Sequence, residues 1–137
     1  MMAGVISPAS ASLGLLVLAA LCLAQPARAQ NVACNVRCAK QILSKPKSFA
    51  ASLLVSEAMM ARSITKYCPG TRIVASRKPT YDLFLADARK VFGFMGAGKM
   101  QRYSDRRARE SIELYGGCAG MRKIFNAKFA AWLLGWK

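Results

Sequence analysis

The chain has 137 residues, with 21 lysines and arginines against 6 aspartates and glutamates, no histidine and 5 cysteines. This length suits a single domain. Without histidine, the sequence excludes a Ser-His-Asp triad, a Cys-His pair and any zinc site built on imidazole. The net charge of +15 indicates that a partner of this protein is anionic, or that it works near an anionic surface.

The first 29 residues are typical of an export signal. An apolar run of twelve residues covers positions 13–24, and Ala27 and Ala29 then form a small-x-small cleavage site. Such a run is too short to span about 30 Å of hydrocarbon at ~1.5 Å per residue. We therefore predict a cleaved signal peptide at residues 1–29 and a single basic helical domain at residues 30–137. This domain would be exported to a bacterial periplasm or to the extracellular medium.

The mature domain keeps four cysteines, Cys34, Cys38, Cys68 and Cys118. An even number in an exported chain predicts two disulfides. Within a helix, Cys34 and Cys38 would lie one turn apart, so a bond between them would constrain little. We favour bonds that join each of them separately to Cys68 or Cys118 and close long loops. A redox or metal site is the alternative, but redox motifs usually have CxxC rather than CxxxC, and Cys68 and Cys118 are not close in sequence as paired structural zinc ligands usually are.

Helical periodicity extends over most of the mature chain. A first helix is predicted at residues 32–44, with Asn31 as its N-cap and Pro46 beyond its end. A second helix is predicted at residues 48–68, because large apolar side chains recur there at three-to-four spacing until Pro69 and Gly70. Residues 71–78 are expected to form a connector.

A third helix is predicted to begin at Thr80, with an apolar stripe that ends at Phe92. The glycine-rich segment 93–99 follows. It matches the G-x-x-x-x-G-K part of a phosphate loop, but Met100 replaces the serine or threonine that would bind magnesium. We expect this segment to be a helix end followed by a hinge.

A fourth helix is predicted at residues 104–115, and it carries the densest group of cations in the sequence. Glu110 and Glu113 stand four residues after Arg106 and Arg109, so part of the group is expected to form ion pairs within the helix. Such a group is either a solvated face or a binding patch. The candidate patch comprises Arg102, Arg106, Arg107 and Arg109.

The last segment, residues 121–137, reads as one amphipathic helix with an aromatic stripe and several cations. Packing of this stripe on the core is the interpretation that we favour. Tryptophan and lysine on one helix are also typical of membrane interfaces and of docking surfaces. The candidate membrane-binding or partner-binding residues are Phe125, Lys128, Phe129, Trp132, Trp136 and Lys137.

These observations predict an all-α fold, a small bundle of four to five helices stapled by two disulfides. Among the acids, only Glu57 lies near an apolar stripe, and one carboxylate does not make a catalytic pair. We therefore predict no catalytic residue, no cofactor and no metal. The predicted function is non-catalytic recognition of an anionic protein or envelope component. The alternative is a protein that binds membrane or lipopolysaccharide through its C-terminal helix, whereas export argues against nucleic acid as the partner.

Overall fold

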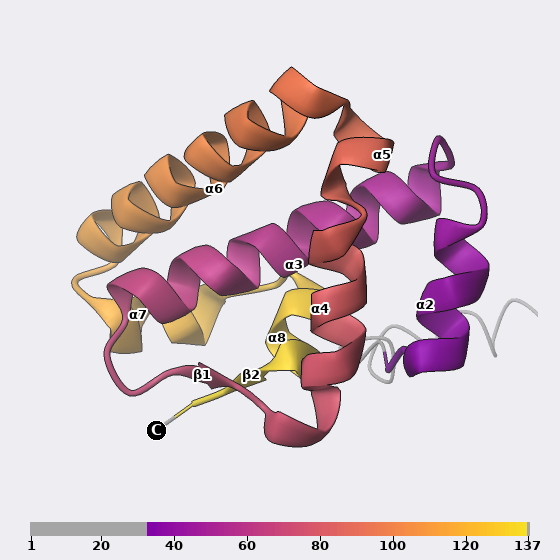
Figure 1. Ribbon diagram of the computed structural model, residues 1–137. Coiled ribbons are helices and arrows are strands. Elements are labelled where there is room, and N and C mark those ends of the chain that lie inside the picture. The colour runs from indigo at the N-terminus through magenta and orange to yellow at the C-terminus, as the bar shows by residue number, and fades with distance from the viewer. Residues whose placement is uncertain (1–32, 137) are drawn as a thin grey trace, which may run out of the picture. The chain divides into compact units, whose positions relative to one another are not determined.

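The computed structural model describes residues 33–136. The predicted signal peptide at residues 1–29 and the candidate residue Lys137 therefore lie outside the described residues. The fold is all-α, as predicted, with two disulfides and one very short pair of strands (Figure 1). The elements in chain order are α2 (Val36–Leu43), α3 (Phe49–Tyr67), β1 (Arg72–Ile73), a 3-10 turn (Ala75–Arg77), α4 (Lys78–Ala86), α5 (Ala88–Phe92), α6 (Phe94–Leu114), α7 (Cys118–Ile124), α8 (Lys128–Leu133) and β2 (Leu134–Gly135).

Helix α3 is the central element, and it contacts α2, α4, α5, α6 and α8. It begins where Ser48 accepts a hydrogen bond from the backbone N–H of Ala51 at 3.2 Å, which satisfies one free donor of the first turn. Its last residue is Tyr67, and Cys68 forms the C-cap directly before Pro69. These bounds agree with the predicted helix at residues 48–68 to within one residue at each end.

The hydrophobic core surrounds α3. Phe84 of α4 and Phe129 of α8 are fully buried, and their rings meet edge to face with centroids 5.3 Å apart. From α3, Val55 and Ile64 are equally buried. Helices from the middle and the end of the chain therefore share one core with α3.

Helix α6 lies along α3 and runs in the same direction (Figure 1). Gln101 donates to the carbonyl oxygen of Met59, and Asp105 accepts from Ser63, so equivalent turns of the two helices face each other. Only Ser104 and Ala108 of α6 are buried. The opposite side of this long helix is therefore free to carry charged groups.

The glycine-rich segment 93–99 is not the hinge that the sequence predicted. The turn is confined to Gly93, whose positive φ of 83° suits glycine because other residues rarely adopt it. Helix α6 then begins at Phe94, ten residues before the predicted start at residue 104. Gly96 and Gly98 are accommodated inside the helix, where the neighbouring packing outweighs their weak helix propensity.

The disulfide pairing that we favoured from the sequence is wrong. Cys34 is bonded to Cys38, and Cys68 is bonded to Cys118. The physical reason lies in the start of α2, which is capped by Asn35 rather than Asn31. Cys34 precedes this cap in a non-helical segment, from which its sulfur reaches Cys38 in the first turn of the helix.

The C-terminal segment is not one amphipathic helix either. Helix α7 ends at Ile124, the chain is extended at Phe125 and Ala127, and α8 begins at Lys128. The carboxylate of Glu57 in α3 accepts hydrogen bonds from the backbone N–H groups of Phe129 and Ala130, at 2.8 and 3.1 Å. A contact across the fold therefore caps a new helix where the local sequence favours one continuous helix.

After α8 the chain pairs with the connector that follows α3. Strands β1 and β2 are antiparallel, with Arg72 opposite Gly135 and Ile73 opposite Leu134. Leu133 and Leu134 are buried, so this pairing holds the described end of the chain against the core.

Candidate functional site

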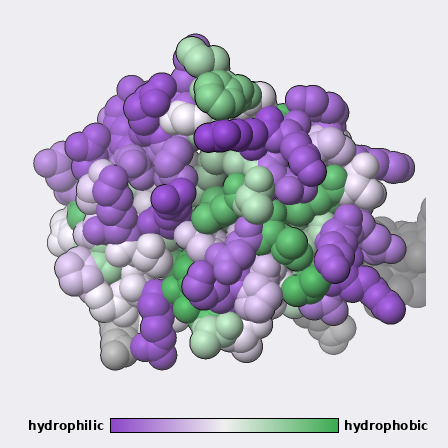
Figure 2. Space-filling model, in the orientation of Figure 1, coloured by the Kyte–Doolittle hydropathy of each residue, from purple (hydrophilic) through white to green (hydrophobic). Residues whose placement is uncertain are grey.

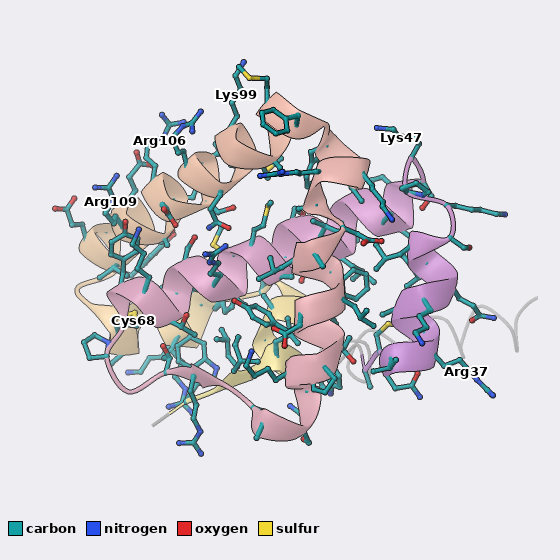
Figure 3. All side chains as sticks on the ribbon, viewed as in Figure 1. Arg37, Lys47, Cys68, Lys99, Arg106 and Arg109 are labelled. Carbon is teal, nitrogen blue, oxygen red and sulfur yellow. A yellow bond between two sulfur atoms is a disulfide. The ribbon has the colours of Figure 1, made fainter. Side chains whose placement is uncertain are left out.

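A row of cations follows the outer side of α6. Lys99, Arg102, Arg106 and Arg109 are spaced by three, four and three residues, which places them on one face of the helix. All four are exposed. Figure 3 shows Lys99, Arg106 and Arg109 projecting in turn along α6, and Figure 2 shows that hydrophilic surface covers most of this side of the molecule.

Two tyrosine rings lie among these cations. The guanidinium of Arg109 is 5.6 Å from the ring centroid of Tyr67, and that of Arg106 is 5.8 Å from the centroid of Tyr103. Tyr67 is the last residue of α3, and the ammonium of Lys66 is also 5.3 Å from its ring. Cations over aromatic faces gain about 0.5–1 kcal/mol at exposed sites. We call the whole surface the basic face, and it comprises Lys66, Tyr67, Lys99, Arg102, Tyr103, Arg106 and Arg109.

The ion pairs that the sequence predicted within α6 are not formed. Between residues 33 and 136, neither Arg106 with Glu110 nor Arg109 with Glu113 comes within 4.0 Å. The guanidinium groups turn towards the tyrosine rings instead. This leaves their charge available to a ligand.

Two adjoining hollows shape this surface. One has a volume of about 420 Å³ and lies over the row of cations, and the other, of about 440 Å³, lies towards Ile112 and the carboxylates of Glu110 and Glu113. Tyr67, Arg106 and Arg109 line both hollows. Part of the basic face is therefore shallowly hollowed.

Asp105 lines the first hollow and accepts a hydrogen bond from Ser63 of α3. Burial raises the pKa of its carboxyl group, but hydrogen bonds from Ser63 and Gln101 and the charge of Lys66 outweigh burial, so the pKa is lowered overall. The pKa of Lys66 is raised, first by its interaction with the Tyr67 side chain and then by the negative charge of Asp105. Both groups are thus charged at neutral pH, and Asp105 is engaged within the protein.

Three of the four arginines predicted as a patch, Arg102, Arg106 and Arg109, line the first hollow together. Arg107 is exposed but does not line either hollow, although its guanidinium is 6.0 Å from the ring of Tyr103. Sequence reasoning missed Lys66, Tyr67, Lys99 and Tyr103. The spacing of residues 99, 102, 106 and 109 would have revealed the row, but the contribution of α3 depends on tertiary packing.

The candidate residues of the C-terminal segment are not brought onto one face. Phe129 is fully buried, and Trp132 stacks on it with ring centroids 5.7 Å apart. Phe125 instead meets Trp136 edge to face at 6.1 Å, and Lys128 is exposed at the start of α8. Most of this aromatic surface therefore packs within the protein.

Among residues 33–136, no helix combines the length and the apolar character needed to cross a membrane. In the same residues, no group of three or more carboxylates and thiols is placed to hold a metal ion. Comparisons with protein-family models, with curated proteins and with solved structures found no match to this chain.

Proposed function

We propose that this protein is an exported, non-catalytic binding protein whose basic face binds an acidic segment of a partner protein. The observation that carries the proposal is the row of Lys99, Arg102, Arg106 and Arg109 beside the exposed ring of Tyr103 and the half-buried ring of Tyr67. Two disulfides are compatible with an oxidising compartment. Together with the predicted signal peptide, they support a location in the bacterial periplasm or outside the cell.

The dimensions of the row suit a short peptide. Lys99 and Arg109 are ten residues apart on α6, which corresponds to about 15 Å at 1.5 Å per residue. An extended peptide covers this distance with about five residues at ~3.3 Å each. Three carboxylates on alternate residues of such a peptide would lie within reach of the four cations of the row.

The composition of the basic face favours protein as the partner. Arginine and tyrosine are enriched where protein interfaces carry most of their binding energy, because both present large flat groups together with polar ones. Each guanidinium can bind a carboxylate through two parallel hydrogen bonds. The tyrosine rings under Arg106 and Arg109 restrict these side chains before binding, so less conformational entropy is lost.

The C-terminal segment does not favour the membrane alternative that the sequence raised. That alternative requires Phe129 and its aromatic neighbours to face outward from one helix. Phe129 instead lies in the core, and α8 is only six residues long.

A labelled acidic peptide tests the proposal. We expect a fluorescent glutamate-rich peptide to bind the oxidised protein saturably, as measured by fluorescence anisotropy at low and at physiological salt. The variant Arg102→Ala/Arg106→Ala/Arg109→Ala should bind about tenfold more weakly, because three exposed ion pairs at about 0.5 kcal/mol each add up to roughly the 1.4 kcal/mol that corresponds to tenfold.

The control removes the same charge elsewhere. Arg37, Lys40 and Lys45 are exposed on α2 and in the loop after it, and the variant Arg37→Ala/Lys40→Ala/Lys45→Ala should bind nearly as well as the unaltered protein. Equal weakening in the two variants would mean that net charge alone attracts the peptide. In that case the basic face would not be a specific site.

A further inference from the structure

A second exposed surface lies at the end of the molecule where α3 and α6 begin. Because these helices run side by side in the same direction, their N-terminal ends lie at the same end of the molecule. The ammonium group of Lys47 reaches the carbonyl oxygen of Val91 at 3.5 Å, which joins the start of α3 to α5. Four large apolar side chains are exposed at this end, namely Phe49 (82%), Leu53 (43%), Phe94 (73%) and Met95 (70%).

The backbone at Gly93 places two of these side chains at a protruding corner. The turn between α5 and α6 needs the positive φ of Gly93, and Phe94 and Met95 then form the start of α6. Gly98 follows one turn later, is exposed and has no side chain that could cover them. In Figure 2, apolar groups stand out at the top of the molecule, above the corner between α5 and α6 in Figure 1. We call this corner the apolar tip, and it comprises Phe94 and Met95.

Exposed cations lie close to the apolar tip. The guanidinium of Arg89 lies 4.7 Å from the ring centroid of Phe94, and Lys90 and Lys99 are exposed nearby in sequence. Asp87 is the acid closest in sequence to the tip, and its carboxylate is 4.0 Å from the ammonium of Lys90. Exposed apolar side chains next to exposed cations match the boundary of a bilayer, where acyl chains lie beneath anionic headgroups.

We propose that the apolar tip docks this protein onto a bilayer that contains anionic phospholipid. Phe94 and Met95 enter the boundary between headgroups and acyl chains, while Arg89 and Lys90 remain at the level of the phosphates. Long cationic side chains can do this because their apolar stems reach along the inserted groups. The inserting residues Phe94 and Met95 lie outside the basic face, although Lys99 lies close to both surfaces.

A bilayer fits the tip better than a second copy of the chain does. Two copies meeting at this corner would bring Arg89, Lys90 and Lys99 of one molecule against the same cations of the other. Like charges in such a contact oppose association, whereas anionic headgroups neutralise them.

Flotation with lipid vesicles tests this proposal. We expect the oxidised protein to float with vesicles of phosphatidylcholine that contain about 30 mol% phosphatidylglycerol, and to bind phosphatidylcholine vesicles much more weakly. The variant Phe94→Ser/Met95→Ser should bind the anionic vesicles at least about tenfold more weakly, since it removes the apolar groups that insert. Circular dichroism should show that this variant keeps its helical content, because both side chains are exposed.

The matched control is Leu114→Ser/Ile124→Ser. These apolar side chains are 75% and 48% exposed, and they lie at the end of α6 and in α7, away from the tip. The control variant should float as the unaltered protein does. Equal flotation of the tip variant and the unaltered protein would overturn the proposal, and so would equal loss in the two variants.

A site-specific probe provides a second measurement. In the variant Phe94→Trp, brominated lipids should quench the fluorescence of the added tryptophan at position 94. The unaltered protein, which has only Trp132 and Trp136, should show less quenching. Absence of this added quenching would show that the tip does not enter the bilayer.

If sedimentation shows dimers that the tip substitutions abolish, without vesicle binding, the tip is a contact between copies and the proposal fails. The variant Arg102→Ala/Arg106→Ala/Arg109→Ala removes the peptide-binding arginines but keeps the tip. When Phe94→Trp is combined with it, the added quenching should remain, so bilayer docking can be tested independently of peptide binding.

Discussion

At the scale of single residues, Asp105 connects the basic face to the core. Its carboxylate accepts hydrogen bonds from the hydroxyl of Ser63 at 2.6 Å and from the amide of Gln101 at 3.2 Å, and it pairs with Lys66 at 3.4 Å. Ser63 is fully buried, and the Asp105 side chain is only 19% exposed. One carboxylate therefore fixes the register between α3 and α6, and with it the position of Tyr67 relative to Arg109.

The lowered pKa of Asp105 makes a prediction about pH. A carboxyl group whose pKa is lower in the folded than in the unfolded state stabilises the fold above its unfolded value, here 3.8. That stabilisation is lost as the pH falls through the lower folded value. We expect Asp105→Asn to reduce the free energy of unfolding by about 1–3 kcal/mol at pH 7, because it removes the charge from a hydrogen-bonded, largely buried site.

Urea denaturation between pH 7 and pH 2 measures this effect. The difference between the unaltered protein and Asp105→Asn should be constant above about pH 5 and should shrink as the pH approaches 2. Asp82→Asn is the control, since Asp82 is 56% exposed and pairs with Lys78 of the same helix. A difference for Asp105→Asn that stays constant down to pH 2 would contradict the lowered pKa.

At the scale of elements, the end of the chain acts as part of the core. The spacing of residues 121–137 predicts one helix with one aromatic stripe. The break at residues 125–127 instead separates these aromatic residues, so they have different roles. Phe129 is fully buried between Phe84 and Trp132, whereas Trp132 is half-buried under the guanidinium of Arg77.

This difference predicts unequal costs of truncation. Phe129→Ala should lower the free energy of unfolding by about 3–5 kcal/mol, because it leaves a cavity in a closed part of the core. Trp132→Ala should cost clearly less, since solvent can fill part of the space that its ring leaves. Thermal or chemical denaturation followed by circular dichroism would measure both values. Equal and small costs would show that α8 does not hold the core together.

The same elements show what a sequence can predict. The bounds of α3 were predictable because Ser48 and Pro69 terminate it with local signals. The start of α8 was not, because the residue that caps it is Glu57, more than seventy positions away in sequence. Part of the candidate site followed from the arginines of α6, but Tyr67 reaches it from α3, and only the packing of the two helices reveals this.

At the scale of the whole molecule, α6 carries two surfaces of different chemistry. Its middle carries the basic face, and its start carries the apolar tip. Asp105 holds the middle of α6 on α3, whereas the start of α6 projects from the turn at Gly93. A molecule docked on a bilayer by its tip would therefore keep Arg106 and Arg109 available to a partner, at the far end of the row.

The two disulfides should contribute unequally to the stability of this arrangement. Cys68 and Cys118 are 50 positions apart and join the end of α3 to the start of α7, whereas Cys34 and Cys38 are only four positions apart. In the loop-entropy model, the long loop gives about 4 kcal/mol and the short loop about 2 kcal/mol. Cys68→Ala/Cys118→Ala should therefore lower the urea midpoint more than Cys34→Ala/Cys38→Ala does, under non-reducing conditions.

Because Tyr67 immediately precedes Cys68, the first variant should also weaken binding of the acidic peptide, while the second should leave it unchanged. Equal loss of stability in both, with peptide binding intact, would show that the Cys68–Cys118 bond supports neither the fold nor the basic face.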